Sequence, residues 1–210
     1  MHRLPQLKAV SIRESVGQVV REALYQHRFQ AGESLSEAGL AAEMGISRGP
    51  VREALLVLVQ EGLLTHSPNR GFAVVNFTKD DLDEVNEVRV PLETLALTLA
   101  KPRMSTADLE KLSERKREMV KSYADGEIFG CSHSDMAFHS LIWERTGNGR
   151  LASSLRTLLD PFFAYGSLFN VGREGLTPRL LDEEHEYFIE FLSGSGTRDA
   201  EACVRFHLGL

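Results

Sequence analysis

The chain has 210 residues, a formal net charge of −6 and 42% hydrophobic residues. This length suits one large domain or two modest ones, and this share of hydrophobic residues can fill a core, which excludes a chain that is disordered throughout. No apolar run approaches the roughly 18 residues of a membrane-spanning helix, and the two cysteines form no metal-binding or redox motif. We therefore expect a cytoplasmic protein that has no membrane partner.

The charge is distributed unevenly along the chain. Residues 1–77 contain eight Lys or Arg and seven acidic residues, a balance of +1, whereas residues 78–210 contain 16 and 23, a balance of −7. The sequence pattern also changes at Thr78. We therefore expect two domains, the first over residues 8–77 and the second over residues 78–210.

The first predicted domain contains three helices and a hairpin. A capping box at Ser11-Ile12-Arg13-Glu14 predicts the first helix, and a second box at Ser34-Leu35-Ser36-Glu37 predicts a short helix that ends near Gly45. Ser47 is the expected N-cap of a third helix, which ends at Gly62. Two short apolar runs then flank the turn over residues 67–71, which predicts a β-hairpin.

Helical periodicity follows from residue 78 nearly to the C-terminus, starting with a capping box at Thr78-Lys79-Asp80-Asp81. The breaks in this pattern predict about six further helices and no strand. The expected fold is mainly α. It consists of an N-terminal winged helix-turn-helix with a small β-hairpin, followed by a C-terminal all-α helical bundle.

The third predicted helix carries two arginines at its N-terminal end. Arg48 and Arg52 are four residues apart, so they project from one face. The N-terminal end of a recognition helix meets base edges, and a guanidinium pairs bidentately with guanine. Ser47 and the free N–H groups of the first turn can hold a phosphate, and the hairpin turn at Asn69-Arg70-Gly71 can reach the minor groove or the backbone. The alternative is a solvent-exposed helix face that contacts no DNA.

The same segment resembles the winged helix of the GntR family of bacterial regulators. The resemblance covers residues 8–77 and depends on the run Gly45-Ile46-Ser47-Arg48-Gly49-Pro50-Val51-Arg52-Glu53-Ala54-Leu55, on Glu61-Gly62-Leu63 and on Asn69-Arg70-Gly71. It implies that Arg48 and Arg52 contact bases and that Ser47 and Gly71 contact the backbone or groove. Gly49, Pro50 and Arg70 complete the expected DNA-binding set. The family often has a basic residue at Ala38 and a threonine at Gly49, so these two contacts are expected to be missing.

One carboxylate and three imidazoles in the second half form a candidate metal site. Asp135 and His139 are four residues apart on one predicted helix, whereas His185 and His207 lie on two later ones. Helix bundles build metal sites from such inward side chains, and this ligand set favours Zn, Ni, Fe or Mn over Ca. Spacing alone relates only Asp135 to His139. The alternative is that these are separate structural residues.

The second half resembles the FCD domain of the FadR subfamily over residues 80–210. The matching stretches are Val88-Arg89-Val90-Pro91-Leu92-Glu93, Asp135-Met136-Ala137-Phe138-His139, Gly147-Asn148, Glu184-His185 and residues 199–207. The resemblance implies that Asp135, His139, His185 and His207 hold a divalent transition metal. It also implies that Arg89 meets the carboxylate of a small organic-acid effector. The alternative for Arg89 is a solvent-exposed ion pair with Glu93.

Together these features predict a homodimeric, sequence-specific transcriptional regulator that is not an enzyme. We expect a repressor that binds double-stranded DNA at a palindromic operator and is released by a small carboxylate at the metal. The alternative function is a metal-dependent hydrolase or lyase that uses a metal-bound water at the same site. Glu183, Glu184 and Glu186 lie near the predicted ligand His185 as candidate bases, but the sequence has no HExxH motif.

Overall fold

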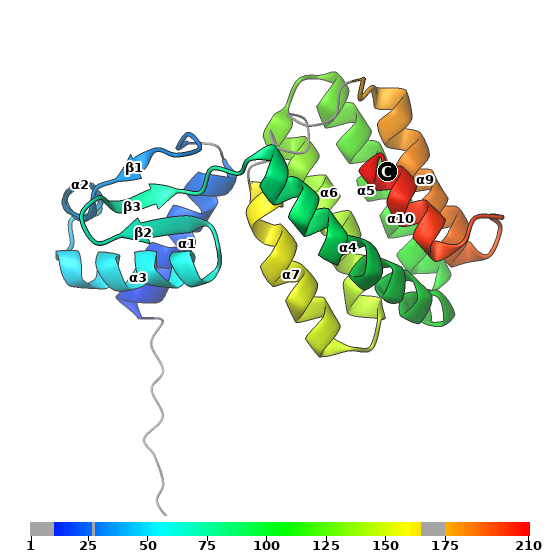
Figure 1. The fold of residues 1–210 in the computed structure, drawn as a ribbon, viewed down its shortest axis with the longest axis horizontal. Helices are drawn as coiled ribbons and strands as arrows, with labels where there is room; N and C mark the ends of the chain where they lie inside the picture. Colours follow the sequence, from blue (N-terminus) through cyan, green and yellow to red (C-terminus); the bar gives the residue numbers. More distant parts are fainter. Residues whose placement is uncertain (1–10, 27, 165–174) are drawn as a thin grey trace, which may run out of the picture. The chain divides into compact units, whose positions relative to one another are not determined.

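The computed structural model describes residues 11–26, 28–164 and 175–210 (Figure 1). Residues 8–10 of the first predicted domain therefore lie outside the described part. The chain divides into two compact units, with the division between Val75 and Asn76. Among the described residues, no helix is both long enough and apolar enough to span a membrane.

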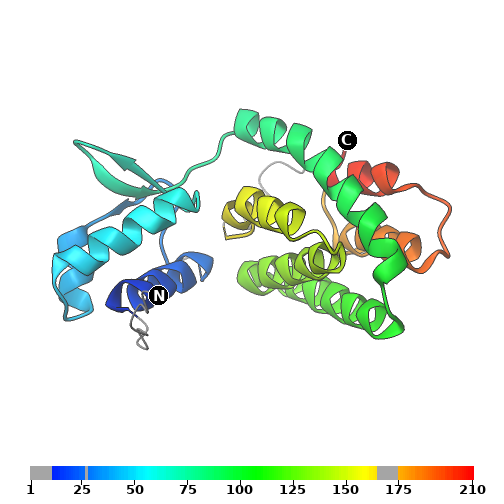
Figure 2. The ribbon, with the colours of Figure 1, turned by 90° about the horizontal axis from the view of Figure 1, so that it is seen from below.

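The N-terminal unit combines three helices with a small antiparallel sheet. The helices are α1 (Ile12–Tyr25), α2 (Glu37–Glu43) and α3 (Arg48–Gln60), and the strands are β1 (Ser34–Leu35), β2 (Leu64–Ser67) and β3 (Gly71–Val74). The strand order is β1-β3-β2. Helix α3 packs against both α1 and β2 (Figure 2), and its Leu55 and Leu58 are completely buried there. Burial of this apolar stripe stabilises the helix that carries the two arginines.

The start of the second helix was predicted wrongly. Ser34 and Leu35 do not begin a helix but form β1, which pairs with β3 so that Leu35 lies opposite Phe72. Both of these side chains are buried, and their burial favours the strand over an additional helical turn. Ser36 is the N-cap of α2 instead, because its Oγ accepts a hydrogen bond from the Gly39 N–H at 3.1 Å.

Helices joined by turns and loops make up the described residues of the C-terminal unit, which contain no strand. Its elements are α4 (Lys79–Ala100), a 3-10 turn η1 (Lys101–Arg103), α5 (Thr106–Ala124), α6 (Ile128–Arg145), α7 (Gly149–Ala164), α9 (Pro178–Ser193) and α10 (Ala200–Leu208). Helix α4 packs against α6, α7 and α10, and α5 packs against α6 and α9. Side chains from five of these helices, including the fully buried Phe138 and Phe188, form a shared core. The predicted mainly α fold class is confirmed.

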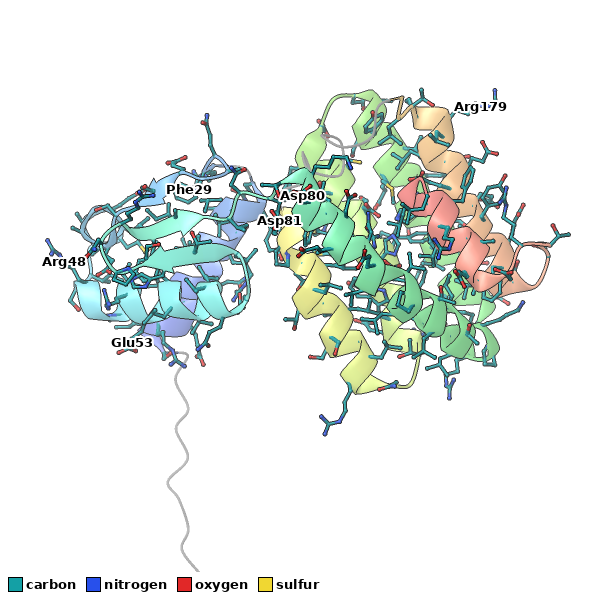
Figure 3. All side chains as sticks on the ribbon, viewed as in Figure 1. Phe29, Arg48, Glu53, Asp80, Asp81 and Arg179 are labelled. Carbon is teal, nitrogen blue, oxygen red and sulfur yellow. The ribbon has the colours of Figure 1, made fainter. Side chains whose placement is uncertain are left out.

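Capping boxes begin two of these helices, and only the first of the two boxes was predicted from the sequence. Thr78 and Asp81 form the predicted capping box at the start of α4, where Figure 3 labels Asp81. Ser105 and Asp108 form another at the start of α5. Asp108 also accepts two hydrogen bonds from Arg145 at the end of α6, at 3.0 and 2.7 Å. This bidentate pair fixes the end of α6 against the start of α5.

We expect Asp108→Asn to lower the free energy of unfolding by about 1–3 kcal/mol at pH 7, the usual range for hydrogen bonds to charged groups. Hydrogen bonds from Arg145 and Ser105 hold the pKa of Asp108 well below its ordinary value. Because the folded-state pKa is lowered, this contribution is present above the unfolded-state pKa of about 4 and is lost as the pH falls below it. Urea unfolding of both proteins at pH 7 and pH 3 should show a smaller difference at pH 3. An equal difference at both pH values would contradict the assignment.

Candidate functional site

The turn before α3 leaves the Ser47 hydroxyl outside the helix. Gly45 has a φ of +65°, which a glycine adopts without strain, and the chain then reverses into α3. Ser47 occupies the N-cap position, but its side chain makes no capping hydrogen bond, contrary to the prediction. At the caps formed by Ser11 and Ser36, the N–H of the third helical residue donates such a bond, but in α3 this residue is Pro50, which has no N–H. The hydroxyl is therefore not used to cap the helix.

Arg48 and Arg52 are both exposed at the N-terminal end of α3. Figure 3 shows Arg48 pointing outward from the start of the helix. Arg52 is paired with Glu37 of α2, with 2.7 Å between Nη1 and Oε1, while half of its side chain remains exposed. Sequence analysis named Glu37 only as part of a capping box and not as a partner of Arg52. This contact links α2 to the arginine face of α3.

The wing is the hairpin formed by β2 and β3, as predicted. The Arg70 N–H donates to the Ser67 carbonyl at 3.1 Å, and the strands pair from Ser67–Gly71 to Leu64–Val74. Gly71 has a φ of +74°, a left-handed conformation that strains other residues. Asn69 and Arg70 are exposed at the tip. The wing thus presents one guanidinium to the solvent in the same unit as the arginines of α3.

In the C-terminal unit, three helices bring one carboxylate and three imidazoles together. Asp135 and His139 lie on α6, His185 on α9 and His207 on α10. One ring nitrogen of each histidine lies within 4.8 Å of the others. The Oδ1 atom of Asp135 lies 3.3 Å from Nε2 of His139 and 3.2 Å from Nε2 of His185. All four residues are buried, so the helices bring together the four predicted ligands.

The outward ring nitrogens of the three histidines each face an oxygen atom. His185 Nδ1 lies 2.8 Å from the Leu181 carbonyl, His139 Nδ1 lies 3.0 Å from Glu93 Oε2, and His207 Nδ1 lies 3.4 Å from Glu184 Oε1. A carbonyl or carboxylate oxygen accepts a hydrogen, so we assign the proton of each neutral ring to Nδ1. This assignment leaves the Nε2 lone pairs for the centre of the cluster.

The inner atoms of the cluster then require a cation. In the neutral form of both rings, the lone pairs of His139 Nε2 and His185 Nε2 face the same carboxylate oxygen of Asp135, and acceptors this close repel each other unless a proton or a metal ion lies between them. The Nε2 atom of the buried His139 has no hydrogen-bond partner among the residues that the structure describes. A divalent metal satisfies these lone pairs together, and the donor set of three imidazoles and one carboxylate suits a transition metal. The residues present therefore fit such an ion.

The charges around the cluster favour a cation as well. Burial lowers the pKa of His139, but Glu93 and Asp135 outweigh it and raise that pKa to about 9. Burial raises the pKa of Asp135, but contacts with His139 and His185 hold it well below its ordinary value. Burial, together with the neighbouring His185, His139 and Arg89, lowers the pKa of His207 well below its ordinary value, which favours the neutral ring.

Arg89 lies beside the cluster, on α4. Its side chain is 2% exposed, its Nε donates to Glu93 Oε1 at 2.5 Å, and its Nη2 lies 3.2 Å from His207 Nε2. The ion pair with Glu93 that we considered as an alternative is therefore present, but it is buried and not solvent-exposed. A buried guanidinium with a donor directed at the histidine cluster can bind a carboxylate.

Two carboxylates next to the histidines were predicted in other roles, Glu93 as a solvent-exposed partner of Arg89 and Glu184 as one of three candidate bases of the alternative hydrolase. Glu93 and Glu184 have side chains that are only 3% and 2% exposed, and they face His139 and His207. The available signals were the four-residue spacing of Glu93 from Arg89 and the position of Glu184 directly before His185. Both signals are also common on exposed helix faces, so sequence could not distinguish these acids from surface residues.

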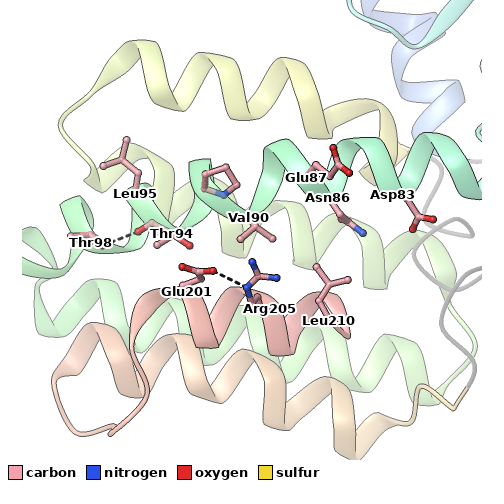
Figure 4. Close-up of a pocket in the computed structure, with 11 residues that line it drawn as sticks. Asp83, Asn86, Glu87, Val90, Thr94, Leu95, Thr98, Glu201, Arg205 and Leu210 are labelled. Carbon is pink, nitrogen blue, oxygen red and sulfur yellow. Dashed lines mark hydrogen bonds and ion pairs between the residues drawn. The ribbon is translucent and has the colours of Figure 1, made fainter.

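A separate groove of about 810 Å³ lies between α4 and α10 (Figure 4). Val90, Pro91 and Thr94 line it on α4, and Glu201 and Arg205, which are paired at 2.8 Å, line it on α10. Asp135 and the three histidines are not among its lining residues. The groove and the buried cluster are therefore distinct features of this unit.

Comparison with known proteins gave two family matches. The model described as "Bacterial regulatory proteins, gntR family" matches residues 12–74, and the FCD domain model matches residues 84–210. The chain is 30% identical over 172 residues to the HTH-type transcriptional regulator YdhC of Bacillus subtilis (strain 168), covering 81% of this chain and 76% of the relative. It is 34% identical over 182 residues to the gluconate operon transcriptional repressor of Bacillus licheniformis, covering 84% and 72%. The solved structure of E. coli McbR/YncC matches with a TM-score of 0.74 and 26% identity, covering 96% of this chain and 95% of that one.

Proposed function

The chain belongs to the gntR family of bacterial transcriptional regulators and carries an FCD domain, and from this premise we propose a specific mode of regulation. It is a cytoplasmic homodimer that binds a palindromic operator as a repressor. A small carboxylate, bound at a metal ion in the FCD domain, lowers its affinity for the operator. The Bacillus licheniformis relative is a gluconate operon repressor, which supports repression as the sign of control.

The observation that carries the DNA-binding proposal is the exposed N-terminal end of α3. Arg48 and Arg52 are available there to contact base edges, and the Ser47 hydroxyl is not used by the helix, so it can bind a phosphate. Gly49 and Pro50 have no bulky side chain at this end, which allows close approach to the DNA backbone. Arg70 and Gly71 of the wing supply a second contact.

A direct test uses DNA from the intergenic region next to the gene. Fluorescence anisotropy at fixed salt compares this duplex with a scrambled duplex of the same length and composition. We expect the intergenic duplex to bind about 10³-fold or more tightly than the scrambled duplex, which is the lower end of the range for specific DNA-binding proteins. We also expect two chains to bind each duplex. Equal affinity for intergenic duplexes from both sides of the gene and for the scrambled duplex would contradict specific operator binding there.

The effector proposal depends on the metal cluster and on Arg89. Asp135, His139, His185 and His207 would hold the ion, which would supply a Lewis-acidic anchor for a carboxylate oxygen. Arg89 lies within reach of the same cluster and would pair with the carboxylate. In a thermal unfolding screen, small carboxylates are added to protein that already contains Zn²⁺. Relative to Zn²⁺ alone, we expect at least one carboxylate to raise the unfolding temperature of the wild type and none to raise that of Arg89→Met. Equal stabilisation of both proteins would exclude Arg89 as the carboxylate contact.

Arg70→Ala should weaken DNA binding without changing sequence preference. Arg70 lies at the tip of the wing, where a phosphate or sugar contact is expected, so its loss should affect operator and scrambled duplexes by the same factor. The slope of log affinity against log salt concentration should become shallower by about 1. Anisotropy titrations at four salt concentrations measure both quantities. A loss confined to the operator would instead indicate that Arg70 contacts bases.

A further inference from the structure

The buried ion pair between Arg89 and Glu93 contacts two different histidines of the metal cluster. Glu93 binds Arg89 through Oε1 and places Oε2 3.0 Å from His139 Nδ1. Arg89 binds Glu93 through Nε and places Nη2 3.2 Å from His207 Nε2. The two members of one ion pair therefore contact different kinds of ring nitrogen. Glu93 contacts an outward nitrogen, Nδ1 of His139, and Arg89 contacts an inward nitrogen, Nε2 of His207.

Glu93 favours metal binding by His139. Its carboxylate faces Nδ1, so the ring keeps its proton there and directs Nε2 towards Asp135 and the centre of the cluster. Its negative charge, which is only 3% exposed, also offsets part of the charge of a divalent ion. A ligand histidine held in this way by a carboxylate is more basic and is better oriented.

Arg89 opposes metal binding by His207. A guanidinium has only donors, so in this contact His207 Nε2 must be the acceptor and must direct its single lone pair at Nη2. The same lone pair cannot bind a metal ion at the same time. The positive charge of Arg89 adds repulsion towards a divalent cation in a buried setting, where screening by water is weak.

We propose that Arg89 and Glu93 set the metal affinity of this site in opposite directions. Glu93 positions His139 for ligation, whereas Arg89 competes with the metal for His207. If His207 Nε2 were a metal ligand, Arg89 would lose this acceptor and could pair instead with the carboxylate of a ligand, while Glu93 would still hold Nε. The inference rests on the proposed metal centre and adds an order of events, in which metal binding precedes carboxylate binding.

The test compares Co²⁺ affinities of the wild type, Glu93→Gln and Arg89→Met. Affinities are measured by competition with a chromophoric chelator, and the visible absorption of bound Co²⁺ reports its ligand geometry. We expect Glu93→Gln to bind Co²⁺ about 10- to 100-fold more weakly, as is usual when such a supporting carboxylate is lost, and with an altered spectrum. We expect Arg89→Met to bind it about 3- to 30-fold more tightly, within the range of couplings between residues in contact.

The opposite changes in Co²⁺ affinity expected for the two variants distinguish specific effects on His139 and His207 from a general structural effect. If the ion pair only maintained the fold, both variants would bind Co²⁺ more weakly. Wild-type affinity in Glu93→Gln, or weaker binding by Arg89→Met, would overturn the inference. His139→Ala tests the metal centre itself, because equal Co²⁺ binding by His139→Ala and wild type would remove the proposed function as well, whatever the other variants do.

A double variant keeps the test decisive if Glu93→Gln does not fold. That variant leaves the buried Arg89 without its carboxylate partner, whereas Arg89→Met/Glu93→Gln removes both charges together. Circular dichroism establishes which variants are folded. We expect the double variant to bind Co²⁺ about 10- to 100-fold more weakly than Arg89→Met, because His139 again lacks its carboxylate. Equal affinities of these two proteins would contradict the role of Glu93.

Discussion

Arg48→Ala and Arg52→Ala should each weaken binding to the operator by about 5- to 150-fold, the equivalent of one bidentate arginine–guanine contact at 1–3 kcal/mol. Both side chains are exposed at the end of α3 that meets base edges in a recognition helix. The loss should be much smaller on a scrambled duplex, since a base contact contributes specificity. Anisotropy titrations against both duplexes at one salt concentration measure this difference.

The two variants should differ from each other in one respect. Arg52 is paired with Glu37, so its removal also exposes an unpaired carboxylate on the DNA-binding face. Because this carboxylate repels the DNA phosphates, the loss of operator affinity should depend more strongly on salt concentration for Arg52→Ala than for Arg48→Ala. Arg117→Ala, which removes an exposed arginine from α5, is the matched control for the change in charge. If both α3 variants bind the operator as Arg117→Ala does, α3 is not the recognition helix.

His139→Ala should abolish stoichiometric metal binding. The wild type should retain about one Zn, Ni, Fe or Mn ion per chain after dialysis, and a metal at 100 times its dissociation constant should raise the free energy of unfolding by about 2.7 kcal/mol. His139 is fully buried, and its ring faces the carboxylates of Asp135 and Glu93. Its replacement removes a ligand that no nearby surface group can substitute for.

Elemental analysis and thermal unfolding with and without a chelator measure the two effects. His133→Ala is the matched control, because His133 is exposed on the same helix and its loss should leave both quantities unchanged. The chelator should lower the unfolding temperature of the wild type and of His133→Ala, but not that of His139→Ala. Equal metal content in His133→Ala and His139→Ala would exclude His139 as a ligand.

Features that depend on a few neighbouring residues could be predicted from the sequence. The capping boxes at Ser11 and Thr78 were correct, because each box is completed within one helical turn. The Ser34 box failed, because β1 is stabilised by pairing with β3, almost forty residues later. Ser47 is the N-cap of α3 as predicted, but its side chain makes no capping hydrogen bond, for a reason that the sequence does contain, namely the missing N–H of Pro50.

The candidate metal site was predictable in its residue types but not in its geometry. The spacing of Asp135 and His139 places them on one helix face, yet only the packing of α6, α9 and α10 brings His185 and His207 to them. The role of Glu93 depends on its burial against His139, and no pattern within α4 distinguishes it from an exposed partner of Arg89. Long-range packing therefore determined the parts that sequence missed.

The central claim is that the metal site controls DNA binding. The most direct measurement is the operator dissociation constant of the wild type and of His139→Ala, each in Zn²⁺ with and without the carboxylate that stabilises the wild type most. Because coupled sites usually change each other's affinity by about 5- to 150-fold, we predict a weakening of that size for the wild type and no change for His139→Ala. An operator affinity that does not respond in the wild type, or that responds equally in both proteins, would contradict the account.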